Sequence, residues 1–146
     1  MDITRLAIGT IVGGITLYIV GYLIFDLALA NFYAESLIDV DGAYRDAPVQ
    51  WLQAVGNLLL GALVTLGIMS RAGTPSIAGG FAIGALIGFP AWGGADFSLV
   101  ALMNVWSPTI VLIDPLVEAI HHGTAGAVIA AVLARVPKSS AIRPAE

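Results

Sequence analysis

The chain has 146 residues, of which 58% are hydrophobic and 11% are charged, and its mean hydropathy is +0.92. A soluble domain of this length could not bury that much apolar surface, whereas a lipid bilayer solvates it directly. The formal net charge of −4 argues against a basic surface for nucleic acid, and the absence of cysteine excludes disulfides, thiolate metal sites and a cysteine nucleophile.

Four apolar segments follow one another along the chain, at about 6–30, 49–70, 77–95 and 108–135, and a polar tail follows at 136–146. Each segment can cross the ~30 Å of hydrocarbon in a bilayer as a helix that rises ~1.5 Å per residue. The first segment begins after Arg5 and superficially resembles a signal peptide, but its uncharged stretch is longer than a usual signal core. We therefore expect a retained helix and a single transmembrane domain.

The boundary between the third and fourth segments, from Trp92 to Ile113, is the hardest to place. Pro90 and Gly93-Gly94 should kink or end the third helix, and the apolar stretch that follows fits either a short interfacial helix or an extension of the third span. Ser107-Pro108 and Asp114-Pro115 both have the polar residue followed by proline that is typical of a helix start. We favour a fourth helix that begins at Pro108 and is kinked at Pro115.

The distribution of charge predicts the orientation. With four spans, both termini and the loop between the second and third spans lie on one side, which carries five of the six basic residues: Arg5, Arg71, Arg135, Lys138 and Arg143. The positive-inside rule places that side in the cytoplasm. The opposite side carries Arg45, the acidic residues Glu35, Asp39, Asp41 and Asp46, and the interfacial aromatic residues Phe32, Tyr33, Tyr44, Trp51, Trp92 and Trp106.

Small residues recur at four-residue spacing, in the rows Gly9-Gly13, Gly80-Gly84-Gly88 and Gly126-Ala130-Ala134. Such rows let helix backbones approach closely in a bilayer, although some will arise by chance among seventeen glycines. The row Gly80-Gly84-Gly88 is the one that we expect to be a contact face.

The second and fourth segments share a pattern that indicates a duplication. Gln53, Asn57 and Gly61 have the same spacing as Glu118, His122 and Gly126, and Gly13-Gly14 in the first segment matches Gly79-Gly80 in the third. Two duplicated helical hairpins would be related by a pseudo-two-fold axis along the membrane normal. The paired helices would then bring Gln53, Asn57, Glu118 and His122 together, although chance matches among glycines and alanines are the alternative.

Polar residues within the spans need a reason, because a charge in hydrocarbon costs about 2.5 kcal/mol or more. Counted along the helices, they all lie in the outer half or near the middle, whereas the inner half is almost entirely small and aliphatic. We predict a ligand or proton site in the outer half, with Glu118 and His122 as its central pair. The surrounding residues would be His121, Asp114, Asn57, Gln53, Asp26 and Asp96.

Other interpretations of this cluster remain open. Glu118 and His122 lie one helical turn apart, so they could form a self-satisfied structural network without a ligand. Glu118 and His121 form a Glu-x-x-His unit, but a di-iron bundle needs two such units. A single divalent ion could be held by Glu118, His122 and an outer aspartate. The only two histidines are adjacent and cannot clamp a haem from opposite faces, so no cofactor and no enzymatic reaction is assigned.

Three stretches resemble small bacterial four-helix membrane proteins that are classed as domains of unknown function. They are Gly13-Gly14 to Phe25-Asp26, the run from Pro115 to Gly126 with Glu118 and His121-His122, and Ala125-Gly126-Ala127. The resemblance implies an all-α transmembrane four-helix bundle in the bacterial inner membrane, and it supplies no activity.

Three functional hypotheses follow from the sequence. The first is a small binding or transport protein of the inner membrane, with an outward-facing polar site. The second is a structural or accessory subunit that docks into a larger membrane complex through its small-residue faces. The third is a metal-dependent membrane enzyme. The partner that all three share is the lipid bilayer, and a homodimer could supply the inner exit that transport requires.

Overall fold

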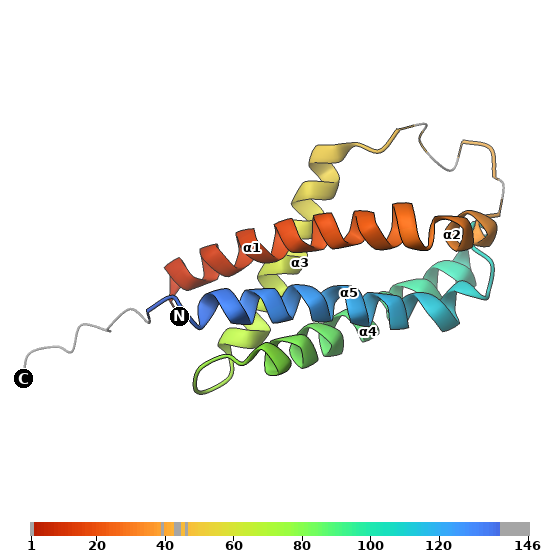
Figure 1. The fold of residues 1–146 in the computed structure, drawn as a ribbon. Coiled ribbons are helices and arrows are strands. Elements are labelled where there is room, and N and C mark those ends of the chain that lie inside the picture. Colours follow the sequence, from red (N-terminus) through yellow and green to blue (C-terminus); the bar gives the residue numbers. More distant parts are fainter. Residues whose placement is uncertain (1, 39, 43–44, 46, 138–146) are drawn as a thin grey trace, which may run out of the picture.

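The computed structural model describes residues 2–38, 40–42, 45 and 47–137 (Figure 1). Predictions that concern Asp39, Tyr44, Asp46, Lys138 and Arg143 lie outside these residues, as does most of the predicted tail. The named elements of the described residues are all helices: α1 (Ile3–Gly21), the π-helix η1 (Tyr22–Ala28), α2 (Ala30–Ser36), α3 (Gln50–Met69), α4 (Ile77–Leu102) and α5 (Ile110–Leu133). With α1 and η1 counted as one, four helices are long and apolar enough to cross a membrane. The predicted all-α four-helix membrane bundle is therefore confirmed.

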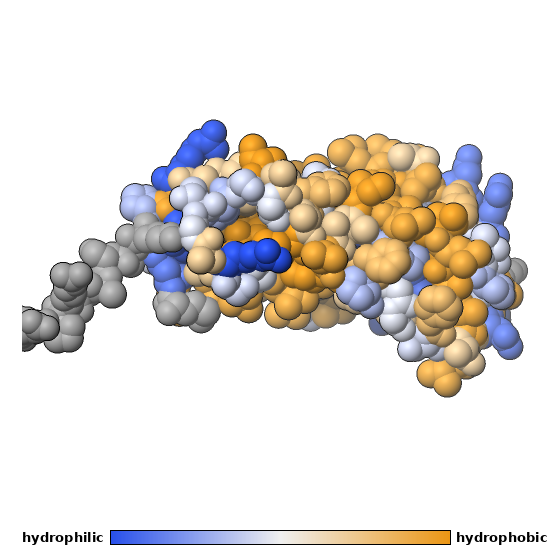
Figure 2. Space-filling model, turned by 90° about the horizontal axis from the view of Figure 1, so that it is seen from below, coloured by the Kyte–Doolittle hydropathy of each residue, from blue (hydrophilic) through white to orange (hydrophobic). Residues whose placement is uncertain are grey.

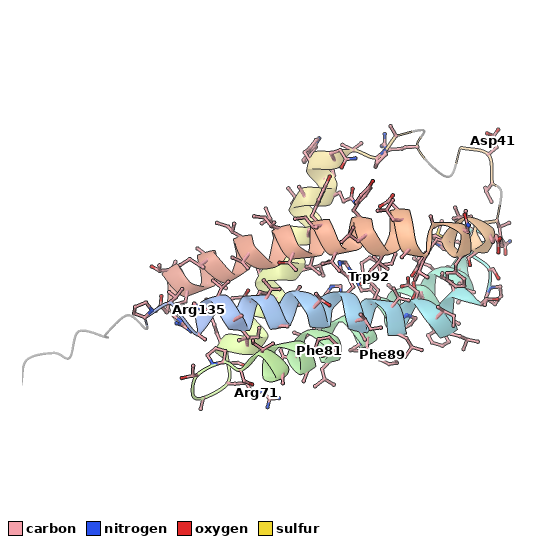
Figure 3. All side chains as sticks on the ribbon, viewed as in Figure 1. Asp41, Arg71, Phe81, Phe89, Trp92 and Arg135 are labelled. Atoms are coloured by element: carbon pink, nitrogen blue, oxygen red, sulfur yellow. The ribbon has the colours of Figure 1, made fainter. Side chains whose placement is uncertain are left out.

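The charged side chains separate to the two ends of the bundle. Arg71 and Arg135 lie at the end where α1 begins and α5 finishes, which we call the basic end, and Asp41 lies at the opposite, far end (Figure 3). At the basic end the Arg5 guanidinium donates a hydrogen bond to the main-chain carbonyl of Val136. Between the two ends the surface is mostly hydrophobic (Figure 2). This separation is the one expected from the sequence, and the side of the membrane that each end faces stays a prediction.

The first span changes its helical type before it ends. α1 passes directly into η1, where the Leu29 N–H donates to the Ile24 carbonyl at 2.7 Å, a step of five residues. The short helix α2 follows, and its end is tied to the α4–α5 connection by an isolated antiparallel bridge between Leu37 and Trp106. The sequence predicts a single helix over about 6–30, and its apolar pattern does not predict either the π-helix η1 or the separate helix α2. π-Helical turns are frequent at functional sites, and these two elements close the far end of the bundle.

The predicted end of the third helix near residue 95 is wrong. α4 continues through Pro90 and Gly93-Gly94 to Leu102, so the stretch of uncertain placement extends the span. Proline and glycine are tolerated within membrane helices where neighbouring helices pack against them, and here Gly93 lies against the Pro115 ring of α5. α5 begins at Ile110, close to the favoured Pro108, and runs through Pro115. Asp114 is therefore inside the helix, and the alternative that it caps the helix start is wrong.

Glycines set the distance between α4 and α5, as expected for Gly80-Gly84-Gly88. A β-carbon at any of these three positions would overlap the main chain of α5, at Gly126, His122 and Glu118 respectively. The same kind of contact joins α1 to α3, where Gly61 lies against the main chain of Gly13-Gly14. This repeated glycine contact fits the predicted duplication, which otherwise stays a prediction.

The half of the bundle near the basic end is solidly packed. Its core consists of side chains from α3 and α5 that are almost completely buried: Val64, Ile68, Ile129, Ala130 and Leu133. α3 leaves this core at an angle to the other three spans (Figure 1), and its first turn is bonded to α1, where the Tyr18 hydroxyl donates to Oε1 of Gln50. Near the loop that joins α3 to α4, Gly67 faces Ile83 and Ile87 of α4. The divergence of α3 leaves room between the helices toward the far end.

Candidate functional site

A cavity of about 520 Å³ lies in the half of the bundle toward the far end. All eight residues that the sequence analysis predicted for a site line this cavity: Asp26, Gln53, Asn57, Asp96, Asp114, Glu118, His121 and His122. They come from η1, α3, α4 and α5, which are distant in sequence. The structure also places aromatic residues in the lining that were not predicted as site residues: Phe25, Tyr33, Trp92 and Trp106.

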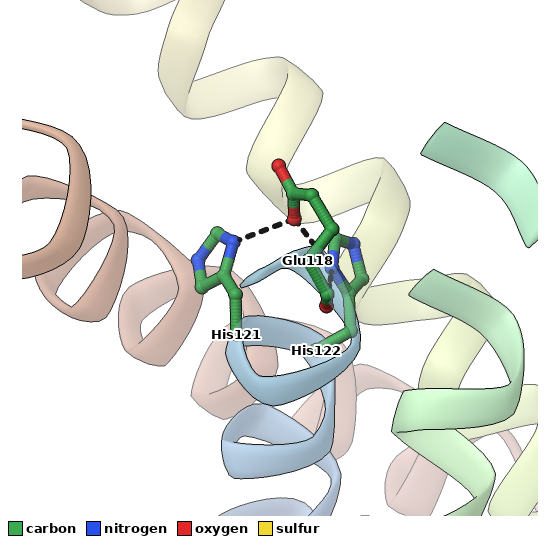
Figure 4. A group of neighbouring side chains, drawn as sticks. All are labelled: Glu118, His121 and His122. Atoms are coloured by element: carbon green, nitrogen blue, oxygen red, sulfur yellow. Dashed lines mark hydrogen bonds and ion pairs between the residues drawn. The ribbon is translucent and has the colours of Figure 1, made fainter. Parts of the chain in front are cut away.

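The deepest polar group in the cavity is a cluster of three side chains from one turn of α5 (Figure 4). The Glu118 carboxyl lies between the two imidazoles, with its Oε2 2.9 Å from Nδ1 of His121 and 3.0 Å from Nδ1 of His122. All three side chains are buried. The predicted pair of Glu118 and His122 therefore exists, and His121 belongs to it as an equal member.

The hydrogen bonds of His121 fix how many protons the cluster holds. Its Nε2 lies 2.9 Å from the main-chain carbonyl oxygen of Leu17, which can only accept, so Nε2 carries a hydrogen. Its Nδ1 faces the Glu118 carboxyl, so a second hydrogen must lie between these two atoms, on one or the other. Glu118 and His121 together are then neutral, which lowers the cost of burying them in the bundle.

His122 has one ring nitrogen bonded and one free. Its Nδ1 lies close to two acceptors, the carboxyl and the main-chain oxygen of Glu118, the latter at 3.1 Å, so Nδ1 is the nitrogen that carries the hydrogen. Its Nε2 is left with a lone pair and has no hydrogen-bond partner among the described residues. Because His122 is only 1% exposed, bulk water does not reach this nitrogen to donate a hydrogen bond to it.

Glycines of the neighbouring helices make room for the two imidazoles. Gly21, at the end of α1, lies against Nε2 and Cε1 of His121. Gly88 of α4 lies against Cβ and Cγ of His122. A β-carbon at Gly88 would overlap the His122 side chain, and one at Gly21 would lie 3.3 Å from Nε2 of His121, so α1 and α4 pack against the cluster from two sides.

A second acidic group lies closer to the far end. The Tyr33 hydroxyl donates to Oδ1 of Asp114, and the carboxyl of Asp96 faces that of Asp114 across the α4–α5 interface. Asp96 is 8% exposed, and its Oδ2 has no hydrogen-bond partner among the described residues, nor has Nε1 of the neighbouring Trp92. The group therefore contains an unsatisfied acceptor and an unsatisfied donor on two residues that line the cavity.

The remaining predicted residues lie at the rim rather than in the depth of the cavity. Asp26 and Gln53 are exposed, and Asn57 is half-buried and donates to the main-chain carbonyl of Gln53 at 3.1 Å. They line the mouth on η1 and on the diverging turns of α3. The expected convergence of Gln53 and Asn57 on Glu118 thus holds for the cavity as a whole and not for direct contact.

Tyr33 lies on α2, outside the spans, and its pKa is raised by burial and then by its hydrogen bond to the Asp114 carboxylate. The folded protein therefore keeps Tyr33 protonated at a pH where the unfolded chain ionises it, above about 10. Stability that is present below pH 10 should be lost as the pH rises further. In thermal melts between pH 8 and 11, we expect Tyr33→Phe to lose less stability above pH 10 than the wild type. Tyr22→Phe is the control, because Tyr22 is 53% exposed. If the two variants lost equally little stability above pH 10, the prediction would be contradicted.

Comparison of the chain with protein-family models, with curated proteins and with solved structures gave no match.

Proposed function

We propose that the protein binds a cationic ligand with an apolar part in the cavity between its helices. The observation that carries this proposal is the composition of the cavity wall. Four carboxyl groups line it, from Asp26, Asp96, Asp114 and Glu118, and among the described lining residues there is no lysine or arginine. A volume of about 520 Å³ suits a small organic molecule, since ligand pockets commonly measure about 300–1,000 Å³.

The aromatic and aliphatic lining supports the apolar part of this ligand. Phe25, Trp92 and Trp106 lie along the same wall as the carboxyl groups, and Leu17, Leu60 and Leu99 complete it. Aromatic faces attract cations, most strongly where water is excluded. The unpartnered Oδ2 of Asp96 is the natural acceptor for the charged group of the ligand.

Binding is better supported than passage through the bundle. The cavity ends at the packed half, where Val64, Ile129 and Leu133 fill the core and Gly80 and Gly126 are in main-chain contact. Transport by a single chain would require this half to open. From the charge distribution and the resemblance, we further propose that the protein lies in a bacterial inner membrane with cytoplasmic termini, so that the cavity is in the outer half.

Tetraphenylphosphonium and tetraphenylborate test the proposal as a matched pair, since they are nearly equal in size and opposite in charge. Trp92 and Trp106 line the cavity, whereas Trp51 is 66% exposed, so Trp51→Phe provides a background in which fluorescence reports the cavity. We expect saturable quenching by the phosphonium and at least tenfold weaker binding of the borate. Equal binding of both ions, or of neither, would overturn the proposal.

Variants locate the charge that the ligand meets. Asp96→Asn removes the carboxylate to which the unsatisfied oxygen belongs. It should weaken phosphonium binding about tenfold or more, which corresponds to about 1.4 kcal/mol. Glu35→Gln is the matched control, because Glu35 is exposed on α2 and does not line the cavity. The same loss in both variants would show that binding follows the overall charge of the protein rather than the cavity.

A further inference from the structure

We infer that Glu118, His121 and His122 bind one divalent transition-metal ion at the deep end of the cavity. Their potential ligand atoms all lie within 4.8 Å of one another, and all three residues are buried. This site shares the Glu118 carboxyl with the cavity wall described above but does not use the unsatisfied oxygen of Asp96, so metal binding and phosphonium binding can be tested separately.

The distances within the cluster suit a shared ion. An ion held about 2.1 Å from each ligand atom separates neighbouring ligands by about 3.0 Å in octahedral and about 3.4 Å in tetrahedral geometry. The Glu118 Oε2 lies 2.9 Å from Nδ1 of His121 and 3.0 Å from Nδ1 of His122. The carboxyl is therefore already placed as a common neighbour of both rings, and small outward shifts would admit the ion.

The surroundings of His121 are those of a metal ligand. Its Nε2 donates to the main-chain carbonyl of Leu17, which orients the ring and leaves Nδ1 directed at Glu118. Metal-ligating histidines almost always donate their other N–H to a carbonyl or carboxylate in this way. Gly21 allows the close approach of α1 that this bond needs.

His122 supplies an independent observation that the cluster is incomplete. A structural network that satisfied itself would leave no ring nitrogen without a partner, yet Nε2 of His122 has none among the described residues and the side chain is 99% buried. If its hydrogen moves from Nδ1 to Nε2, His122 can present Nδ1, which already faces the carboxyl, to an ion. The unsatisfied nitrogen thus indicates a missing partner in the cavity.

The ligand set selects the class of metal. Two imidazoles and one carboxylate suit zinc, manganese, iron, cobalt or nickel, whereas calcium and magnesium prefer oxygen ligands throughout. Three protein ligands leave at least one coordination position open to the cavity. Asp114, one turn before Glu118 on α5, also lines the cavity and places a second carboxyl near the proposed ion.

Cobalt(II) and copper(II) test the site in the full-length protein. The protein is prepared without a histidine tag. Since the chain contains only two histidines, any imidazole bound to the metal is then His121 or His122. We expect one cobalt ion per chain by elemental analysis after dialysis. Pulsed EPR of the copper form should detect two imidazole nitrogens in the wild type and one in His122→Gln. Glu118→Gln should weaken cobalt binding about 100-fold or more.

Glu35→Gln is the control variant, since Glu35 is exposed on α2, does not line the cavity and should leave metal affinity unchanged. Less than stoichiometric cobalt, or copper without imidazole coupling in the wild type, would overturn the inference even if Glu118→Gln does not fold. A metal affinity that is unchanged in His122→Gln would overturn it as well. Phosphonium binding to protein treated with a chelator is measured separately, so the failure of the metal site and the failure of the proposed function are distinguishable.

Discussion

Replacing Gly84 with leucine should prevent α4 from packing on α5 and cost about 3 kcal/mol of stability or more. A β-carbon at residue 84 would overlap the carbonyl group of His122, and a main-chain atom cannot move aside as the end of a side chain can. The whole α4–α5 interface would have to separate, and with it the wall that carries Asp96. Thermal unfolding in detergent and gel filtration measure the loss, and Gly84→Ala should show a smaller effect in the same direction.

Gly94→Leu is the matched control for this substitution. Gly94 lies in the same helix, and no atom of a neighbouring element comes within 4 Å of the position that its β-carbon would take. The variant should unfold close to the wild-type temperature. If Gly84→Leu were as stable as Gly94→Leu, α4 and α5 would not be in the close contact described above.

Replacing Glu118 with alanine should destabilise the protein by about 3–5 kcal/mol, because removing one member of a buried polar group leaves the others without partners. Nδ1 of His121 would lose its acceptor, and Nδ1 of His122 would keep only a main-chain oxygen. Both rings are buried, so bulk water does not replace the lost bond. Thermal or denaturant unfolding in a single detergent measures the change.

Two further variants show whether the loss of stability comes from the broken hydrogen bonds of the cluster or from the loss of a negative charge in general. Glu118→Gln keeps the shape and one acceptor oxygen, so it should be destabilised less than Glu118→Ala. Glu35→Ala removes an exposed carboxyl from α2 and should have little effect. A Glu118→Ala variant as stable as Glu35→Ala would mean that the carboxyl does not hold the two histidines.

The parts of the fold that follow from apolar length and small-residue spacing could be predicted from the sequence. The ranges of the second and fourth helices and the contact face at Gly80-Gly84-Gly88 are of this kind, since they depend on local composition. The end of α4 could not be predicted, because Pro90 breaks an isolated helix, whereas α4 continues past it and packs on α5, with Gly93 against the Pro115 ring. Likewise, nothing in the apolar pattern of 22–28 distinguishes a π-helix from an α-helix.

The candidate site was predictable in its members but not in its layout. Charged residues in apolar segments are conspicuous, so Asp96, Asp114, Glu118, His121 and His122 could be named from sequence. Tyr33 was placed only among interfacial aromatic residues, because its contact with Asp114 depends on η1 and α2. Main-chain partners such as the Leu17 carbonyl leave no signal in a sequence at all.

α1 and α3 cross at Gly61, and the first half of α3 would tilt about that point if the hydrogen bond between Tyr18 and Gln50 broke. Gln50 is about 16 Å along the helix from Gly61, at about 1.5 Å per residue. A rotation of about 10° around that pivot would carry the start of α3 through about 3 Å, together with Gln53 and Asn57 on the cavity wall. The close contacts of α4 with α5 would not have to change. Such a rotation would change the width of the cavity without moving the proposed metal ligands on α5.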